Sequence, residues 1–351
     1  MTRRLARQVH LWTALILCVP LVLLGLTGSV LVFEDELRGD PPQASAGAPH
    51  SATEIVAAAR KAAPADLKPT VYLPATEPGR MATVRFGGTV RVGVDPVSLG
   101  TFPSGNDDLL RQVFFLHSTL LMKNRTGRQV VGFLGVAMLV MAVSGIVNWW
   151  PRANFRPGRS LPEWHGAVGI WALAVFATVS FAGVALAFPE TVRGAVNLIL
   201  PARDLRTVAA ETRVEPVKGA TPIDIDAAIA VAGAALPETR PIAVFLPAQP
   251  SRPYRVAMLR AGQERGGPAA TVLVDPWRGR VVTLLDPREF SAGETMLAWQ
   301  HAIHAGRGLG FGWKMLVALT GLLPLLFTVT GVAMWWRAQL WRRMDERAYD
   351  A

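Results

Sequence analysis

Residues 11–33 read LWTALILCVPLVLLGLTGSVLVF and carry no charged side chain. About 20 apolar residues in a helix cross the hydrocarbon core of a bilayer, and a helix pairs the backbone groups that lipid cannot pair. Three further uncharged stretches of similar length lie at residues 130–150, 166–188 and 315–336. The sequence therefore predicts a membrane protein with four transmembrane helices.

The first of these stretches differs from a cleaved signal peptide in its length and in the residues at its C-terminal end. The apolar core of a signal peptide has about 7–15 residues and precedes a cleavage site made of small residues. Here the apolar run is longer and leads into Glu34, Asp35 and Glu36. We therefore expect residues 11–33 to be retained as a span.

The composition of the chain agrees with a membrane protein. Of its 351 residues 18% are charged and 51% are hydrophobic, whereas about 25% of the residues in soluble domains are charged. The net charge of +10 would suit nucleic-acid binding if the basic residues formed one patch. The single cysteine, Cys18, excludes an internal disulfide and a cysteine-based zinc or iron–sulfur site.

Arginines instead mark three short segments, which gives the chain an orientation. They are Arg3, Arg4 and Arg7, then Arg152, Arg156 and Arg159, and finally Arg337, Arg342, Arg343 and Arg347. Basic residues in short segments favour the cytoplasmic side. We therefore expect a bacterial inner-membrane protein with both termini in the cytoplasm and the two long segments in the periplasm. This distribution gives no support to nucleic-acid binding.

The predicted order of segments results from the spans and their orientation. It runs from a cytoplasmic N-terminus at 1–10 through a span at 11–33, an external segment at 34–129, a span at 130–150, a cytoplasmic link at 151–164, a span at 165–188, an external segment at 189–314 and a span at 315–336 to a cytoplasmic C-terminus at 337–351.

The chain also shows an internal repeat. At a spacing of 155 residues, the matches are His10 with His165, Thr27-Gly28 with Ala182-Gly183, Phe33 with Phe188 and Arg38-Gly39 with Arg193-Gly194. Later matches are Asp95-Pro96 with Asp275-Pro276, His117 with His304, Ser144-Gly145 with Thr330-Gly331 and Trp149-Trp150 with Trp335-Trp336. We interpret these as two parallel repeats, related by an axis along the membrane normal.

Each repeat is expected to hold a small α+β domain between its two spans. In the first, Ser51 and Glu54 form a capping signal for a helix that ends near Ala63, and strands are predicted at 70–73, 81–86 and 90–94. In the second, a helix is predicted at 224–236 and strands at 242–246, 254–259, 271–274 and 281–284. Tracts at 39–50 and 261–269 are typical of linkers or loops.

Histidines near the ends of the spans form two repeat-related pairs. A twofold axis would bring His10 to His165 near the inner surface and His117 to His304 near the outer surface. Two opposed imidazoles in a four-helix bundle are what bis-His haem ligation needs. Metal binding without haem and structural polar contacts are the alternatives. His301 is a second choice to His304, because the residue that matches it in the first half is Phe114.

Basic residues near these histidines are candidates for pairing with haem propionates. They are Arg7 on the inner side and Arg128, Arg307 and Lys314 on the outer side. Interfacial charges that contact lipid headgroups are the alternative. His117 precedes the second span by 13 residues, so we expect a helix that enters the outer leaflet, and a turn at Asn124–Gly127.

The order of several short motifs resembles the family of PepSY-associated transmembrane proteins. The motifs are Leu116-His117-Ser118, Thr126-Gly127-Arg128, Ser144-Gly145, Trp149-Trp150-Pro151-Arg152, Trp164-His165-Gly166, Ile303-His304-Ala305-Gly306-Arg307, Thr330-Gly331 and Trp335-Trp336-Arg337. The resemblance implies four membrane helices with two PepSY-like periplasmic domains. Ala305 and Trp313 depart mildly from the residues common at those positions.

Members of this family resemble ferrioxamine-type siderophore reductases and iron-regulated membrane proteins. The resemblance implies b-type haems, with two as the expected number, ligated by His10, His165, His117 and His304. Electrons from quinol or a partner protein would reduce Fe(III) in a periplasmic ferric siderophore. The alternatives are a non-redox PepSY protein that regulates or binds a periplasmic peptidase, and a transporter of iron or siderophore.

Overall fold

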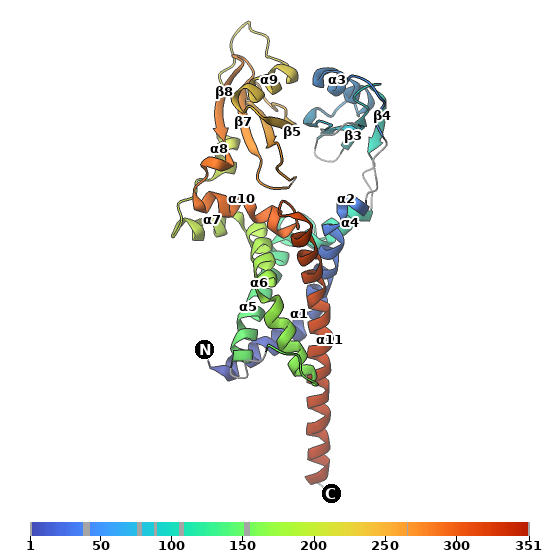
Figure 1. Cartoon of the computed structure of the whole chain (residues 1–351), viewed down its shortest axis with the longest axis vertical. Coiled ribbons are helices and arrows are strands. Elements are labelled where there is room, and N and C mark those ends of the chain that lie inside the picture. The colour runs from blue at the N-terminus through green and yellow to red at the C-terminus, as the bar shows by residue number, and fades with distance from the viewer. Residues whose placement is uncertain are drawn as a thin grey trace. The chain divides into compact units, whose positions relative to one another are not determined.

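The computed structural model describes residues 2–37, 43–75, 79–87, 90–104, 109–150, 155–264 and 266–349 (Figure 1). The repeat match at Arg38-Gly39, the motif residues Pro151-Arg152 and part of the linker at 39–50 lie outside these residues. The chain divides into two compact units. The helical unit comprises residues 1–34, 112–194 and 299–351, and the sheet unit comprises residues 35–111 and 195–298.

Four long helices build the helical unit, and each is long and apolar enough to cross a membrane. They are α1 (Arg3–Val32), α5 (Asn124–Trp149), α6 (Leu161–Ala187) and α11 (Gly310–Tyr349). Each lies over one of the predicted apolar stretches, with α1, α5 and α6 ending one residue short, so the prediction of four long apolar helices is confirmed. α1 and α6 each pack against both α5 and α11, so each of these two helices has the same two neighbours.

Small residues allow a close contact between α1 and α11. A Cβ atom on Gly321 of α11 would lie 2.6 Å from the carbonyl oxygen of Gly25 on α1. One turn further along α1, the Ser29 hydroxyl donates a hydrogen bond to the carbonyl of Ala318 at 2.7 Å. Small and hydroxyl-bearing residues at such crossings are the usual means by which helices associate in membranes.

Two shorter helices precede α5 and α11 in the chain. They are α4 (Leu109–Thr119) and α10 (Ala292–His304), and they carry the two remaining histidines of the predicted pairs. The turn after α4 lies at residues 120–123 and not at Asn124–Gly127, where we expected it, because α5 already begins at Asn124. Leu120 and Leu121 have φ angles of 50° and 58°. This left-handed pair reverses the chain, and Gly127 leaves room for it, since a Cβ there would lie 2.8 Å from that of Thr119.

The sheet unit contains one antiparallel eight-stranded sheet with the order β4-β3-β2-β1-β5-β6-β7-β8. Its strands are β1 (Pro69–Leu73), β2 (Ala82–Phe86), β3 (Val90–Val94), β4 (Thr101–Ser104), β5 (Thr239–Phe245), β6 (Tyr254–Arg260), β7 (Ala270–Asp275) and β8 (Arg280–Leu285). Seven of the eight were predicted. β4 was not, because its sequence contains Pro103, and proline is tolerated in a strand mainly at the edge of a sheet.

The sequence predicted two inserted α+β domains, and the structure joins their strands. β1 pairs with β5 through Val71–Phe245 and Tyr72–Val244. Two helices, α3 (Ala52–Ala62) and α9 (Ile225–Ala235), contribute to one hydrophobic core with both halves of the sheet. Asp226 of α9 also accepts hydrogen bonds from the backbone N–H groups of Ala52 and Thr53 at 2.8 and 2.9 Å, which caps α3.

Short helices complete the described part of the chain. They are α2 (Glu34–Leu37), α7 (Pro189–Asn197), α8 (Leu205–Glu211) and the 3₁₀ turn η2 (Pro287–Glu289). The predicted capping box of α3 is present, since Ser51 and Glu54 bond to each other's backbone N–H groups. A second capping box, formed by Ser160 and Glu163, begins α6.

Candidate functional site

His10 of α1 and His165 of α6 face each other within the helical unit. Their ring centroids lie 6.3 Å apart, and the ring planes are inclined by 78°. Both rings come from helices that share α5 and α11 as neighbours. The two imidazoles therefore meet between those neighbours, inside the helix bundle.

The Nδ1 atoms of this pair bond to the neighbouring helices. His10 Nδ1 lies 3.2 Å from the carbonyl oxygen of Met141 and 3.0 Å from Ser144 Oγ. His165 Nδ1 lies 2.8 Å from Thr330 Oγ1. The Ser144 hydroxyl donates to Met141 at 3.1 Å and the Thr330 hydroxyl donates to Leu326 at 2.9 Å. Because both hydroxyl protons are used, each hydroxyl oxygen accepts from a histidine N–H.

His117 of α4 and His304 of α10 form a second facing pair. Their centroids lie 5.9 Å apart, with the ring planes inclined by 42°. His117 Nδ1 bonds to the Leu24 carbonyl at 3.0 Å and to Thr27 Oγ1 at 3.2 Å. His304 Nδ1 bonds to the Val179 carbonyl at 2.9 Å.

These partners assign one tautomer to all four rings. A carbonyl oxygen only accepts, so an Nδ1 atom bonded to it must carry the proton, and Nε2 then keeps a free lone pair. Within the described part of the chain, no hydrogen bond engages the Nε2 atom of any of the four. An imidazole held through Nδ1–H with a bare Nε2 is the usual state of a metal-ligating histidine.

Each histidine ring also lies over a glycine. A Cβ atom would lie 3.0 Å from the His117 ring at Gly28, 2.9 Å from His304 at Gly183, 3.5 Å from His10 at Gly145 and 4.0 Å from His165 at Gly331. The glycines come from α1, α6, α5 and α11. Missing side chains at these four positions leave the space that the rings occupy.

The spacing of each pair fits one metal ion between two rings. A coordinating imidazole nitrogen lies about 2 Å from a transition metal, so opposed imidazoles on one ion have centroids about 6 Å apart. Among the residues that the structure describes, no three His, Cys, Asp or Glu side chains come together as a metal site. Two facing imidazoles without a third protein ligand would suit a metal whose remaining ligands come from a planar macrocycle such as haem.

His301 lies on the same helix as His304 but is exposed. His304 is the residue whose ring faces His117. The sixth histidine, His50, lies in the sheet unit and bonds to Glu54 at 3.1 Å.

The predicted propionate partners lie in three different environments. Arg7 and Arg128 are exposed. Arg307 forms an ion pair with Glu34 at 3.9 Å, and the ammonium group of Lys314 lies 5.2 Å from the centre of the Phe33 ring. Arg307 immediately follows the turn after α10. Pairing of any of them with a propionate stays a prediction.

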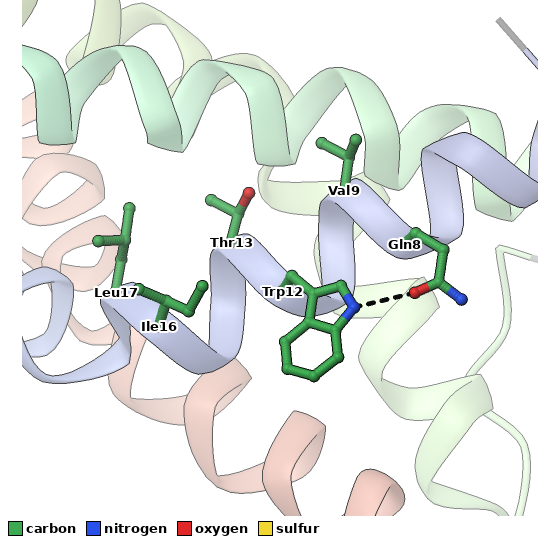
Figure 2. A pocket seen from close by; sticks show the side chains of 6 residues that line it. All are labelled: Gln8, Val9, Trp12, Thr13, Ile16 and Leu17. Atoms are coloured by element: carbon green, nitrogen blue, oxygen red, sulfur yellow. Dashed lines mark hydrogen bonds between the residues drawn. The ribbon is translucent and has the colours of Figure 1, made fainter.

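An open groove lies along the N-terminal part of α1 (Figure 2). It is lined by Gln8, Val9, Trp12, Thr13, Ile16 and Leu17. Trp12 donates its indole N–H to Gln8 at 3.0 Å, and 54% of Trp12 and 70% of Ile16 are exposed. Trp12 and Ile16 therefore belong to the surface that a bilayer would cover, whereas Leu17 packs with Leu21 and Leu24.

The hydroxyls and glycines around the rings were not predicted as site residues. Their signal is a hydroxyl-bearing residue followed directly by glycine, at Thr27-Gly28, Ser144-Gly145 and Thr330-Gly331. In each, the hydroxyl accepts from one histidine and the glycine lies under the same ring. The fourth position has Ala182 before Gly183, and there the Val179 carbonyl accepts from His304 in place of a hydroxyl.

The fold and this site define a multi-pass membrane protein with two pairs of facing histidines in a four-helix unit. The chain belongs to the family described as the PepSY-associated TM region, whose pattern matches residues 7–338. The match therefore covers nearly the whole chain. No curated protein matches it in sequence.

Proposed function

We propose that this protein is an inner-membrane b-type haem protein that passes electrons across the membrane to a periplasmic ferric siderophore. The observation that carries the proposal is the geometry of the four histidines. Each has Nδ1 bonded to the protein and no hydrogen bond at Nε2 among the described residues, and the two rings of each pair have centroids 6.3 or 5.9 Å apart, so the two histidines of a pair would be able to hold one haem iron. Two haems are expected, one between His10 and His165 and one between His117 and His304.

The chain's own residues would hold and orient these groups. Ser144 and Thr330 fix the rings of His10 and His165, while Thr27 and the Leu24 carbonyl fix His117. Bound haem would supply a one-electron carrier. In a bilayer, the apolar helices would keep water away from the rings, which would favour electron transfer over side reactions with solvent.

The positions of the pairs along α1 support transfer across the membrane. His10 and Thr27, which contacts His117, are separated by about 25 Å of helix at 1.5 Å per residue. The hydrocarbon core of a bilayer is about 30 Å thick. One pair would therefore lie near each surface, with His10 and His165 on the cytoplasmic side if the arginine-rich segments face the cytoplasm.

The reaction at the periplasmic side would be the addition of one electron to bound Fe(III). Hard oxygen donors hold Fe(II) less tightly than Fe(III), so reduction would release iron from a siderophore. The electron would come from quinol or from a redox partner protein on the other side.

The paired histidines, each lying over a glycine, also support our interpretation of the chain as a duplicated unit of helix, inserted segment and helix.

The test is a reduced-minus-oxidised visible spectrum of the purified protein, with the ratio of haem to protein. We expect sharp b-type bands and a ratio near two, falling to near one in His165→Ala or in His304→Ala. His301→Ala and His50→Ala are the matched controls and should keep both haems. A colourless protein from haem-replete cells would overturn the proposal and favour a non-redox PepSY protein that binds a periplasmic partner.

A further inference from the structure

A row of arginines crosses the centre of the eight-stranded sheet. Residues directly opposite each other in antiparallel strands point to the same face. The register places Arg91 of β3 opposite Arg85 of β2, then Val71 of β1, Phe245 of β5 and Arg255 of β6 in one continuous row. We call these five residues the arginine row.

The arginine row lies on the face of the sheet away from α3 and α9. Alternate residues of the same strands, such as Val84, Val92, Val244 and Val256, are buried in the core with these two helices. Arg85 and Arg255 are half-buried and Arg91 is exposed. The three arginines and Phe245 are therefore at least partly exposed on this face, whereas Val71 between Arg85 and Phe245 is buried. The exposed part of the row ends at β7, because Leu273, the next residue in register, is fully buried.

The three guanidinium groups have no acidic partner among the residues that the structure describes. The Nε atom of Arg85 is buried and has no hydrogen-bond partner there. Like charges that face each other across neighbouring strands are unfavourable, and Arg85 faces Arg91. Burial, and then the charge of Arg91, lower the pKa of Arg85, and burial lowers the pKa of Arg255. In the absence of a ligand, the guanidinium charges of Arg85 and Arg255 are thus partly buried without a negative partner among the described residues, which is energetically unfavourable.

The side chains around the arginines leave room for a ligand on this face of the sheet. The guanidinium of Arg255 lies over the Phe245 ring, 3.5 Å from its centre. The adjacent row on the same face consists mostly of short side chains, at Gly93, Thr83, Leu73, Ala243 and Ala257, all of them partly exposed. A Cβ atom on Gly93 would meet nothing closer than 3.6 Å.

We propose that the arginine row binds a multiply charged anionic ligand. Resting on the proposed function, this ligand would be a ferric chelate with carboxylate or catecholate groups and a net negative charge. Guanidinium groups bind such oxygens through paired hydrogen bonds. Arg85 and Arg255 lie three strands apart, a span of about 14 Å at 4.8 Å per strand, which matches a chelate with separated anionic groups. Because both side chains are half-buried in the middle of strands, they are better placed for a small ligand than for a bilayer surface.

The experiment measures binding by the full chain in nanodiscs of zwitterionic lipid, using isothermal titration without reductant. The probes are a ferric tris-catecholate complex of charge −3, ferric citrate, and a neutral ferric tris-hydroxamate. We expect both anionic chelates to bind and the neutral one to bind at least about tenfold more weakly. Arg85→Gln and Arg255→Gln should each weaken the anionic chelates by about tenfold. The matched control is Arg280→Gln on exposed β8, which should change nothing.

Thermal unfolding separates a binding role from a structural one. Without ligand, Arg85→Gln should leave the unfolding temperature unchanged or raise it, because a buried charge facing Arg91 is removed. With the tris-catecholate present, the wild-type chain should be stabilised and the variant should not. A lower unfolding temperature in the unliganded variant, or equal binding by wild type and both variants, would overturn the assignment.

Two further results would separate the binding site from other anion sites and from the proposed haem function. Arginine-dependent binding of inorganic phosphate or of anionic vesicles, with no binding of either chelate, would show an anion site for another source and overturn the chelate assignment. This assay needs no electron transfer. A haem-free protein that binds anionic chelates through these arginines would therefore support the binding site and overturn the proposal of a haem reductase. A haem-containing protein whose chelate binding is unchanged in both variants would support the haem proposal and overturn the binding site.

Discussion

The Nδ1 atom of His165 lies 2.8 Å from the Thr330 hydroxyl, and that hydroxyl donates its proton to Leu326 one helical turn away. The threonine can therefore only accept from the histidine. This bond orients the His165 ring, whose centroid lies 6.3 Å from that of His10, and leaves Nε2 without a hydrogen bond among the described residues.

Replacing Thr330 by Val should expose the role of this bond. With the acceptor lost, the imidazole becomes a poorer electron donor and a looser ligand, and loss of such a partner typically lowers metal affinity about 10–100-fold. We expect a raised reduction potential for one of the two haems and easier haem loss. A redox titration followed in the visible spectrum measures both. Thr330→Ser should restore the wild-type potential, and an unchanged potential in the Val variant would exclude the role.

The glycines under the rings give a graded prediction. A Cβ at Gly183 would lie 2.9 Å from the His304 ring, tighter than real contacts allow, whereas a Cβ at Gly331 would lie 4.0 Å from His165. Gly183→Ala should therefore displace His304 and lower the haem ratio toward one. Gly331→Ala, the matched control, should keep both haems. Equal haem content in the two variants would show that the His304 ring has room to move.

The contact between α1 and α11 should be sensitive to a single methyl group. A Cβ on Gly321 would meet the Gly25 carbonyl oxygen at 2.6 Å, and backbone atoms cannot move aside as a side chain can. We expect Gly321→Ala to cost about 1–3 kcal/mol and to shorten the half-life of the detergent-solubilised protein on heating. Gly312→Ala on the same helix meets nothing within 4 Å and should behave as wild type.

Glu294 gives the sheet unit a dependence on pH. Hydrogen bonds from Arg203, at 2.6 Å from Nε, hold the pKa of the buried Glu294 carboxyl at about 2, against an ordinary value of 4.5. A carboxyl with a depressed pKa stabilises the folded state above its unfolded pKa, and this contribution is lost as the pH falls through 4.5 toward 2. The wild-type unfolding temperature should therefore drop between about pH 5 and pH 3 by more than that of Glu294→Gln. Parallel curves for the two chains would contradict this.

The membrane spans were predictable because each depends only on local hydropathy. The cap of α3 was predictable for the same reason, since Ser51 and Glu54 lie within one turn. The turn after α4 was misplaced because its reversal rests on left-handed Leu120 and Leu121, residues that rarely adopt this conformation. Its position depends on close packing against Gly127, which no local pattern reveals.

The histidines could be singled out from the repeat, whereas their partners could not. Thr27, Ser144 and Thr330 look like ordinary small residues of membrane helices until the fold brings a ring to each. The arginine row was invisible for a related reason, because Arg85 and Arg255 are 170 positions apart and share a face only through the pairing of β1 with β5.

The pairing of β1 with β5 also determines when the sheet can be completed during synthesis of the protein. β1 is complete at Leu73, but its partner β5 begins at Thr239, after both α5 and α6 have been synthesised. Until β5 is synthesised, the edge of β1 that pairs with it is unpaired, and an unpaired strand edge can pair with strands of other chains and cause aggregation. Closure of the sheet is therefore a late event of biogenesis, and a nascent chain stalled before β5 would be a natural client for a chaperone that shields strand edges.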